Sequence, residues 1–186
     1  AFSKALGADG VSVGISAGNA MHFAGFQNGS MFRRAPGLGE GFINANLTPS
    51  SGLSASRLFV TLFHLDPDNT ENLYYVDFNE LWRTTSATTA TSFAANFTEL
   101  TGVRTTIGAV NIRSIATSRG AYSATRSKLY FGTNDGRIFR LDDPVNAVAG
   151  SAVPVQINSG AGMPVGTIID IAVNPRSSDT VVAVYS

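Results

Sequence analysis

The chain contains no cysteine, and only two of its 186 residues are lysines, Lys4 and Lys128. Without cysteine it forms no disulfide and holds no thiolate metal site. Charged residues make up only 14% of the chain, and 13 basic residues balance 13 acidic ones. A neutral chain without a basic cluster has no electrostatic attraction for nucleic acid or for an anionic membrane surface. We therefore expect no nucleic-acid partner.

Long apolar runs are also missing, so no segment is expected to cross a membrane as a helix, and we expect no membrane insertion. What the sequence does contain is 44% hydrophobic residues and 19 glycines, together with many serines, threonines and asparagines. This composition is typical of an all-β protein with many turns.

One stretch, Leu129–Asp143, shows the pattern of two strands joined by a tight turn. Its aromatic and apolar ends are typical of buried strands. Between them, Asn134-Asp135-Gly136 provides the glycine that a tight turn needs for its positive φ. The stretch therefore predicts a β-hairpin.

The hairpin has two weaker copies earlier in the chain. His22–Arg33 aligns with it without a gap, and Leu73–Arg83 is one residue shorter in the turn. The spacing is 50 positions from Phe32 to Trp82 and 57 from Trp82 to Phe139. Each copy ends in an aromatic residue followed by arginine: Phe32-Arg33, Trp82-Arg83 and Phe139-Arg140. A period of this size, built of short strands, is typical of a β-propeller blade.

Further strands are expected before and after the hairpins: Val11–Ser16, Phe59–Pro67, Asn111–Ser118, Thr167–Pro175 and Thr180–Tyr185. A short fourth strand is expected at Asn96–Leu100 and at Val153–Ile157, and Ala35–Ser56 is expected to be a long loop with one short strand near Gly41–Leu47. We predict an all-β, β-propeller-like fold of about three four-stranded repeats plus a partial one. The chain is expected to be a single partial domain, residues 1–186, with repeats at approximately 11–57, 58–109, 110–165 and 166–186. No helix is expected, because threonines disfavour one in Ala87–Ala95.

About three repeats and a partial one would leave strand edges and blade faces uncovered. We therefore expect the chain to be a fragment of a larger propeller. Its expected partners include the missing blades, supplied by a longer chain or by another copy.

The repeats resemble the Asp-box (BNR-type) β-propellers, which include sialidase-like, sortilin-type and xyloglucanase-type proteins. The resemblance rests on three stretches: Leu65–Thr85, Leu129–Arg140 and Asp170–Val182. The box that defines the family, Ser-x-Asp-x-Gly-x-x-Trp, is missing. Thr84-Thr85-Ser86-Ala87-Thr88 stands in its place, with serine for the aspartate and threonine for the glycine. The resemblance implies a propeller, and we expect an extracellular or cell-surface protein.

Glycoside hydrolysis requires two carboxylates that face one sugar bond. The resemblance implies one candidate, Asp135, because some xyloglucanase-type propellers place a catalytic aspartate in a Thr-x-Asp-Gly turn. The simpler interpretation is that Asp135 forms the turn, since Asp-Gly is the preferred pair there. No second acid stands out, so an enzyme is the less favoured interpretation.

No metal site or cofactor site is predicted. His22 and His64 fall on different expected strands with no third ligand, which favours structural histidines. Asp66-Pro67-Asp68-Asn69 lacks the length and the terminal glutamate of a calcium loop.

The favoured function is that of a non-catalytic propeller module, in an exported or cell-surface protein, that binds carbohydrate or protein. The candidate ligand-binding residues are those of the turns between paired strands: Gln27, Asn28, Asp77, Asn79, Asn134 and Asp135. Two alternatives stay open at this point. One is a fragment of a propeller glycoside hydrolase with Asp135 as one of its two acids, and the other is a structural repeat of a large adhesin.

Overall fold

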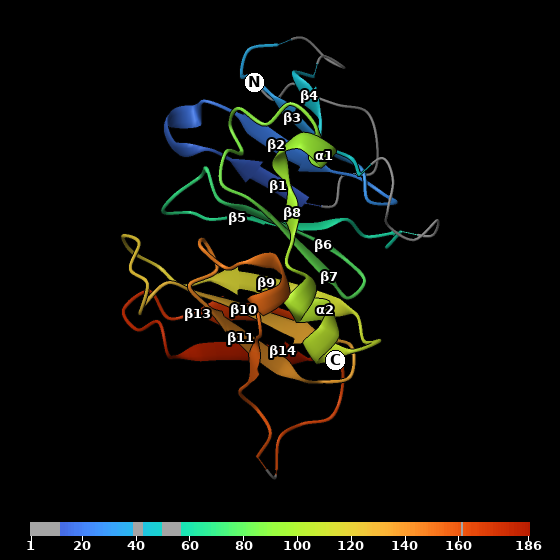
Figure 1. The fold of residues 1–186 in the computed structure, drawn as a ribbon, viewed down its shortest axis with the longest axis vertical. Coiled ribbons are helices and arrows are strands. Elements are labelled where there is room, and N and C mark those ends of the chain that lie inside the picture. The colour runs from blue at the N-terminus through green and yellow to red at the C-terminus, as the bar shows by residue number, and fades with distance from the viewer. Residues whose placement is uncertain (1–11, 39–42, 50–56, 161) are drawn as a thin grey trace. The chain divides into compact units, whose positions relative to one another are not determined.

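The computed structural model describes residues 12–38, 43–49, 57–160 and 162–186. Within these ranges the chain folds into short strands that form four sheets (Figure 1). The first sheet has the order β1-β2-β3-β4 and is antiparallel throughout. Its strands are β1 (Ser12–Ile15), β2 (His22–Gly25), β3 (Met31–Arg34) and β4 (Ala45–Asn46).

Two more sheets have four strands, and the last has two. The second sheet has the order β5-β6-β7-β8, with β5 (Leu62–Leu65), β6 (Leu73–Asp77), β7 (Glu80–Thr84) and β8 (Thr98–Glu99). The third has the order β12-β11-β10-β9, with β9 (Ile112–Thr117), β10 (Lys128–Thr133), β11 (Ile138–Asp142) and β12 (Val155–Gln156). The last contains β13 (Ile168–Val173) and β14 (Val181–Tyr185). The predicted all-β class, with three four-stranded repeats and a partial one, is therefore confirmed.

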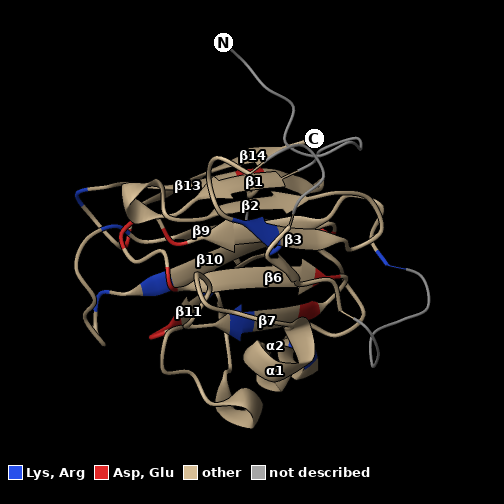
Figure 2. Ribbon diagram, turned by 90° about the horizontal axis from the view of Figure 1, so that it is seen from above, with Lys and Arg blue, Asp and Glu red and all other residues tan. Residues whose placement is uncertain are grey.

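The chain divides into two compact units. The first comprises residues 1–77 and 84–97, and the second comprises residues 78–83 and 98–186. The assignment of the whole chain to a single domain, with the repeat boundaries given above, stays a prediction. Charged residues are few and scattered along the ribbon in both units (Figure 2).

The first and third hairpins, which align without a gap in the sequence, also have the same strand-pairing register. Gly25 pairs with Met31 as Gly132 pairs with Ile138, six positions later in both cases. The turns differ in conformation. Asn28 and Gly29 both have positive φ, at 58° and 75°, whereas in the third hairpin only Gly136 does, at 86°. Gly29 and Gly136, which align with each other, thus both adopt the left-handed conformation that their turns require.

The expectation of an all-strand chain was wrong at two short helices, α1 (Phe93–Asn96) and α2 (Thr101–Ile107). Helix α2 forms in a segment of low helix propensity. Val103 and Ile107 lie four positions apart on one face of it and are both buried. Burial of this face outweighs the local preference of the threonines, because most helical stability in proteins comes from packing. Two single 3₁₀ turns, η1 (Ala17–Asn19) and η2 (Ala149–Ser151), complete the regular elements.

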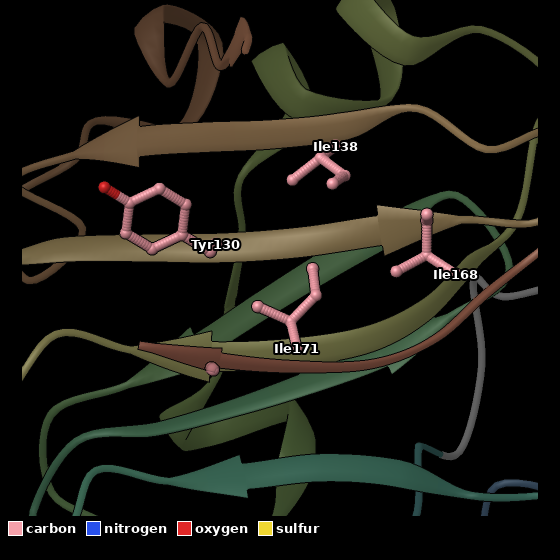
Figure 3. Close-up of a cluster of buried hydrophobic side chains, with 5 residues drawn as sticks. Tyr130, Ile138, Ile168 and Ile171 are labelled. Carbon is pink, nitrogen blue, oxygen red and sulfur yellow. The ribbon is translucent and has the colours of Figure 1, made fainter. Parts of the chain in front are cut away.

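Neighbouring sheets stack face to face within each unit. In the second unit, Tyr130 and Ile138 of the third sheet pack against Ile168 and Ile171 of β13 (Figure 3). In the first unit, Gly14 of β1 and Gly25 of β2 lie close to β5. A Cβ added to either glycine would lie 3.3 Å from side-chain atoms of β5 or of Thr61, the residue before β5. This face-to-face contact between consecutive sheets is the packing that a propeller-like fold requires.

Candidate functional site

The predicted ligand-binding residues lie between the second and third strands of the four-stranded sheets. Gln27 and Asn28 lie between β2 and β3, and Asn134 and Asp135 lie between β10 and β11. At the β6–β7 connection, Asp77 is the last residue of β6, and Asn79 precedes β7. The first unit holds Gln27, Asn28 and Asp77, and the second holds the other three.

Asp77 is a buried residue that accepts a hydrogen bond from the backbone. Only 2% of the residue is exposed. Its Oδ1 accepts from the backbone N–H of Leu58 at 3.2 Å, and Nη1 of Arg57 lies 3.9 Å from its Oδ2. Burial raises the pKa of Asp77, although the Leu58 hydrogen bond and the charge of Arg57 act in the opposite direction. The carboxyl group therefore fixes the segment that enters β5.

Asn79 acts in a similar way in the second unit. Its Nδ2 donates to the carbonyl of Gly108, just after α2, at 2.7 Å. The neighbouring residue Phe78 has a positive φ of 52°, and its carbonyl accepts from the N–H of Ile112 at 2.8 Å. The β6–β7 turn is thereby tied to the segment that enters β9.

Asn134 is exposed but has three structural hydrogen bonds. Its N–H donates to the carbonyl of Asn111, and its Oδ1 accepts from the N–H of Asn111, both at 2.9 Å. Its carbonyl accepts from Oγ1 of Thr167 at 3.1 Å. The β10–β11 turn is therefore tied both to the entrance of β9 and to the entrance of β13.

The β2–β3 turn is also tied to the segment that enters the next sheet. The N–H of Asn28 donates to the carbonyl of Phe59 at 3.1 Å, and half-buried Gln27 forms a β-bridge with Val60, just before β5. In all three places the turn is hydrogen-bonded to the segment that enters the first strand of the following sheet. This role could not be predicted from the sequence, because the hydrogen-bond partners lie about 30 residues away and carry no motif.

The structure brings Asn79, Asn134 and Asp135 to one end of the second unit. Arg137 connects this group, because its Nε lies 2.8 Å from Oδ2 of Asp135 and its Nη2 donates to the carbonyl of Ile107 at 2.9 Å. Asn79 binds the next carbonyl, that of Gly108. The C-terminal end of α2 is thus held by two of the turns, which satisfies carbonyls that a helix end leaves without a partner.

Asp135 itself is bound within its own turn. Oγ1 of Thr133 donates to its Oδ1 at 2.5 Å, in addition to the contact with Arg137. Partial burial raises the pKa of Asp135, but the hydrogen bonds from Thr133 and Arg137 and the charge of Arg137 outweigh it, so the pKa is lowered. A general acid in glycoside hydrolysis needs a raised pKa. The surroundings of Asp135 favour an ionised residue that stabilises the turn.

We predict that the carboxyl group of Asp135 titrates below the usual value of 3.8 in the folded protein. Because its folded-state pKa is lowered, its contribution to stability is present above that value and is lost as the pH falls through the folded-state pKa. NMR titration of the side-chain carboxyl carbon measures this directly. A pKa above 3.8 would contradict the prediction and restore the general-acid hypothesis.

The histidines occupy separate structural positions. His22 on β2 shares a hydrogen bond with Oδ1 of Asn19 at 2.6 Å. His64 on β5 is mostly buried, and this burial lowers its pKa, partly offset by the charge of Asp66. Asp66 accepts from the N–H groups of Asp68 and Asn69, at 3.0 and 3.2 Å, as a turn residue does. No group of three or more potential metal-ligating His, Cys, Asp or Glu side chains occurs among the described residues.

The described part of the chain also contains no helix with the length and apolar character needed to span a membrane.

No family model matches the sequence, and no curated protein matches it. Among solved structures, the C-terminal WD40 domain of Sif2 is similar, with a TM-score of 0.60 and 13% sequence identity. The match covers 96% of this chain and 44% of that chain, so this chain spans less than half of the similar structure's length. At this identity the likeness shows a β-propeller-like fold.

Proposed function

We propose that this chain is part of a non-catalytic β-propeller module that binds a protein through an uncovered sheet face. The observation that supports this proposal is the outer face of the β13–β14 sheet, which comprises Ile169, Asp170, Ala172, Val182 and Val184. Val182 and Val184 are 67% and 48% exposed, although both belong to a regular strand.

The two faces of β13–β14 differ sharply in exposure. The opposite face carries Ile168 and Ile171, which are buried against the third sheet. Strand β14 alternates between half-buried and exposed residues along its whole length, yet its exposed positions are valines. An apolar sheet face exposed to solvent is typical of an interaction surface, since it gains from burial.

The first unit has a face of the same kind on β1. Val13 and Ile15 are 83% and 63% exposed, and between them Gly14 packs against Leu65 and Phe63. In a propeller, both faces would contact a further blade. The partner we propose is therefore a protein sheet with an apolar face, supplied by a longer form of this chain or by another copy. An exported or cell-surface location and a relationship to Asp-box propellers are part of the proposal.

Site-specific photocrosslinking tests the proposal. A p-benzoylphenylalanine at Val182, introduced into the natural full-length protein in its source, is expected to form a covalent adduct with protein. The matched control is Val148, which is 68% exposed but lies outside both faces. Adducts of equal yield at both positions, or none at Val182, would contradict the proposal.

Carbohydrate binding is the second candidate. It is favoured by the exposure of three polar residues at the turns, Asn28, Asn134 and Asp135. Binding of the isolated chain to a glycan array would support this candidate over the first. The hydrolase alternative needs Asp135 to act with a second acid, and the adhesin alternative needs a long uncapped stack of repeats.

A further inference from the structure

We propose that a hollow lined by arginines in the second unit binds a tetrahedral oxyanion, namely a phosphate or sulfate group. The hollow has a volume of about 200 Å³ and lies between the β9–β10 loop and the β13–β14 turn. Its polar lining consists mainly of Arg119, Arg126, Arg176, Ser127, Ser177 and Ser178. This site is separate from the turns and from the sheet faces discussed above.

The β9–β10 loop is held by its own hydrogen bonds. Oγ of Ser118 donates to the carbonyl of Arg126 at 3.1 Å and accepts from the N–H of Lys128 at 2.9 Å. The N–H of Ser127 donates to the carbonyl of Ser123 at 2.7 Å. The backbone that carries Arg126 and Ser127 is therefore fixed on this side of the hollow.

The β13–β14 turn is ordered in a similar way on the other side. The N–H of Arg176 donates to Oδ1 of Asn174 at 2.9 Å, and the N–H of Ser177 donates to the carbonyl of Asn174 at 3.1 Å. The hydroxyl of Tyr130 donates to the carbonyl of Ser178 at 2.5 Å and joins this turn to β10. Both sides of the hollow are therefore positioned by the fold.

The charged residues that line the hollow are all arginines. None of the residues that line it is acidic. The nearest acid along the turn, Asp179, is ion-paired with the buried Lys128, which holds the pKa of Asp179 below its usual value. No ion pair among the described residues involves the side chain of Arg126 or Arg176. A bound anion would supply the counter-charge that these two guanidinium groups lack.

The groups present match the needs of a tetrahedral oxyanion. A guanidinium group donates two parallel hydrogen bonds to a pair of phosphate or sulfate oxygens. Oγ of Ser177 accepts from Oγ1 of Thr180 at 3.1 Å, so its own hydroxyl hydrogen stays available for a bond to the anion. These donors come from two loops about 50 positions apart in the sequence.

Calorimetric titration at constant ionic strength tests the site, with inorganic phosphate and inorganic sulfate as probes and acetate as the comparison. Arg126→Gln and Arg176→Gln are each expected to weaken phosphate binding by roughly tenfold, the usual effect of losing a charge-assisted hydrogen bond. Arg113→Gln is the matched control. Arg113 is an exposed arginine near the start of β9, whereas the hollow lies beyond the end of that strand, so its removal is expected to leave binding unchanged.

The source of the oxyanion is distinguished by a phosphoserine peptide and a sulfated monosaccharide, each compared with its unmodified form. Tighter binding of the peptide assigns a modified protein as the source, and tighter binding of the sugar assigns a sulfated glycan. Equal affinity for the free anion and both esters assigns the free anion. The proposal is overturned if no probe binds more tightly than acetate, or if both arginine variants bind phosphate as the unaltered chain does.

Discussion

Gly132→Ala is expected to lower the free energy of unfolding of the second unit by about 2–3 kcal/mol, the upper range for overpacking. A Cβ at this position would lie 2.3 Å from Cγ2 and 2.4 Å from Cβ of Ile168, and 2.7 Å from Oγ of Ser114. The Cβ of Ile168 is fixed by the backbone of β13, so the contact is relieved only if the whole β13–β14 sheet moves. Urea denaturation monitored by tyrosine fluorescence measures the loss.

Gly25→Ala is the matched control, because Gly25 aligns with Gly132 and has the same position in its hairpin. Its added Cβ would meet side-chain atoms of Phe63 and Thr61 at 3.3 Å, which requires only a small adjustment. We expect a loss below about 1 kcal/mol. Equal losses for the two variants would show that close packing of β13–β14 on the third sheet is not what requires glycine at position 132.

The Asp77→Ala substitution is expected to destabilise the first unit by about 2–3 kcal/mol. It leaves the buried N–H of Leu58 without its acceptor and removes the carboxylate beside Arg57. Asp77→Asn keeps an oxygen that accepts from Leu58, so its cost is expected to stay below about 1 kcal/mol. Denaturant unfolding of the two variants separates the effect of the hydrogen bond from that of the charge.

The raised pKa of Asp77 also predicts how the stability difference between Asp77→Asn and the unaltered chain depends on pH. A carboxyl group whose folded-state pKa is raised contributes stability below its unfolded-state pKa, and this contribution is lost as the pH rises through the folded-state pKa. The stability of Asp77→Asn relative to the unaltered chain is therefore expected to increase between pH 3.8 and neutrality. If Asp77→Ala instead unfolds like the unaltered chain and loses carbohydrate binding, Asp77 is a ligand-binding residue, and the structural role assigned to it above is contradicted.

The strands and their pairing could be predicted from local sequence patterns. Strand periodicity and turn glycines are local properties, so Leu129–Asp143 and His22–Arg33 predict their own hairpins and even their common register. The repeat of these hairpins then indicated a propeller, which the likeness to a WD40 domain supports. Helix α2 was missed because its stability depends on the burial of Val103 and Ile107, which local propensity does not reveal.

The roles of the polar residues, in contrast, depend on the packing of distant segments. Asp77 and Asn79 looked like neighbouring turn residues, yet one is buried against Leu58 and the other binds the end of α2. The arginine-lined hollow is invisible in the sequence, because Arg126 and Arg176 lie 50 positions apart and come together only when β13 stacks on the third sheet. A side chain's partners depend on contacts between residues distant in the chain, and these are set by sheet stacking, whereas strand and turn are set by neighbours in the sequence.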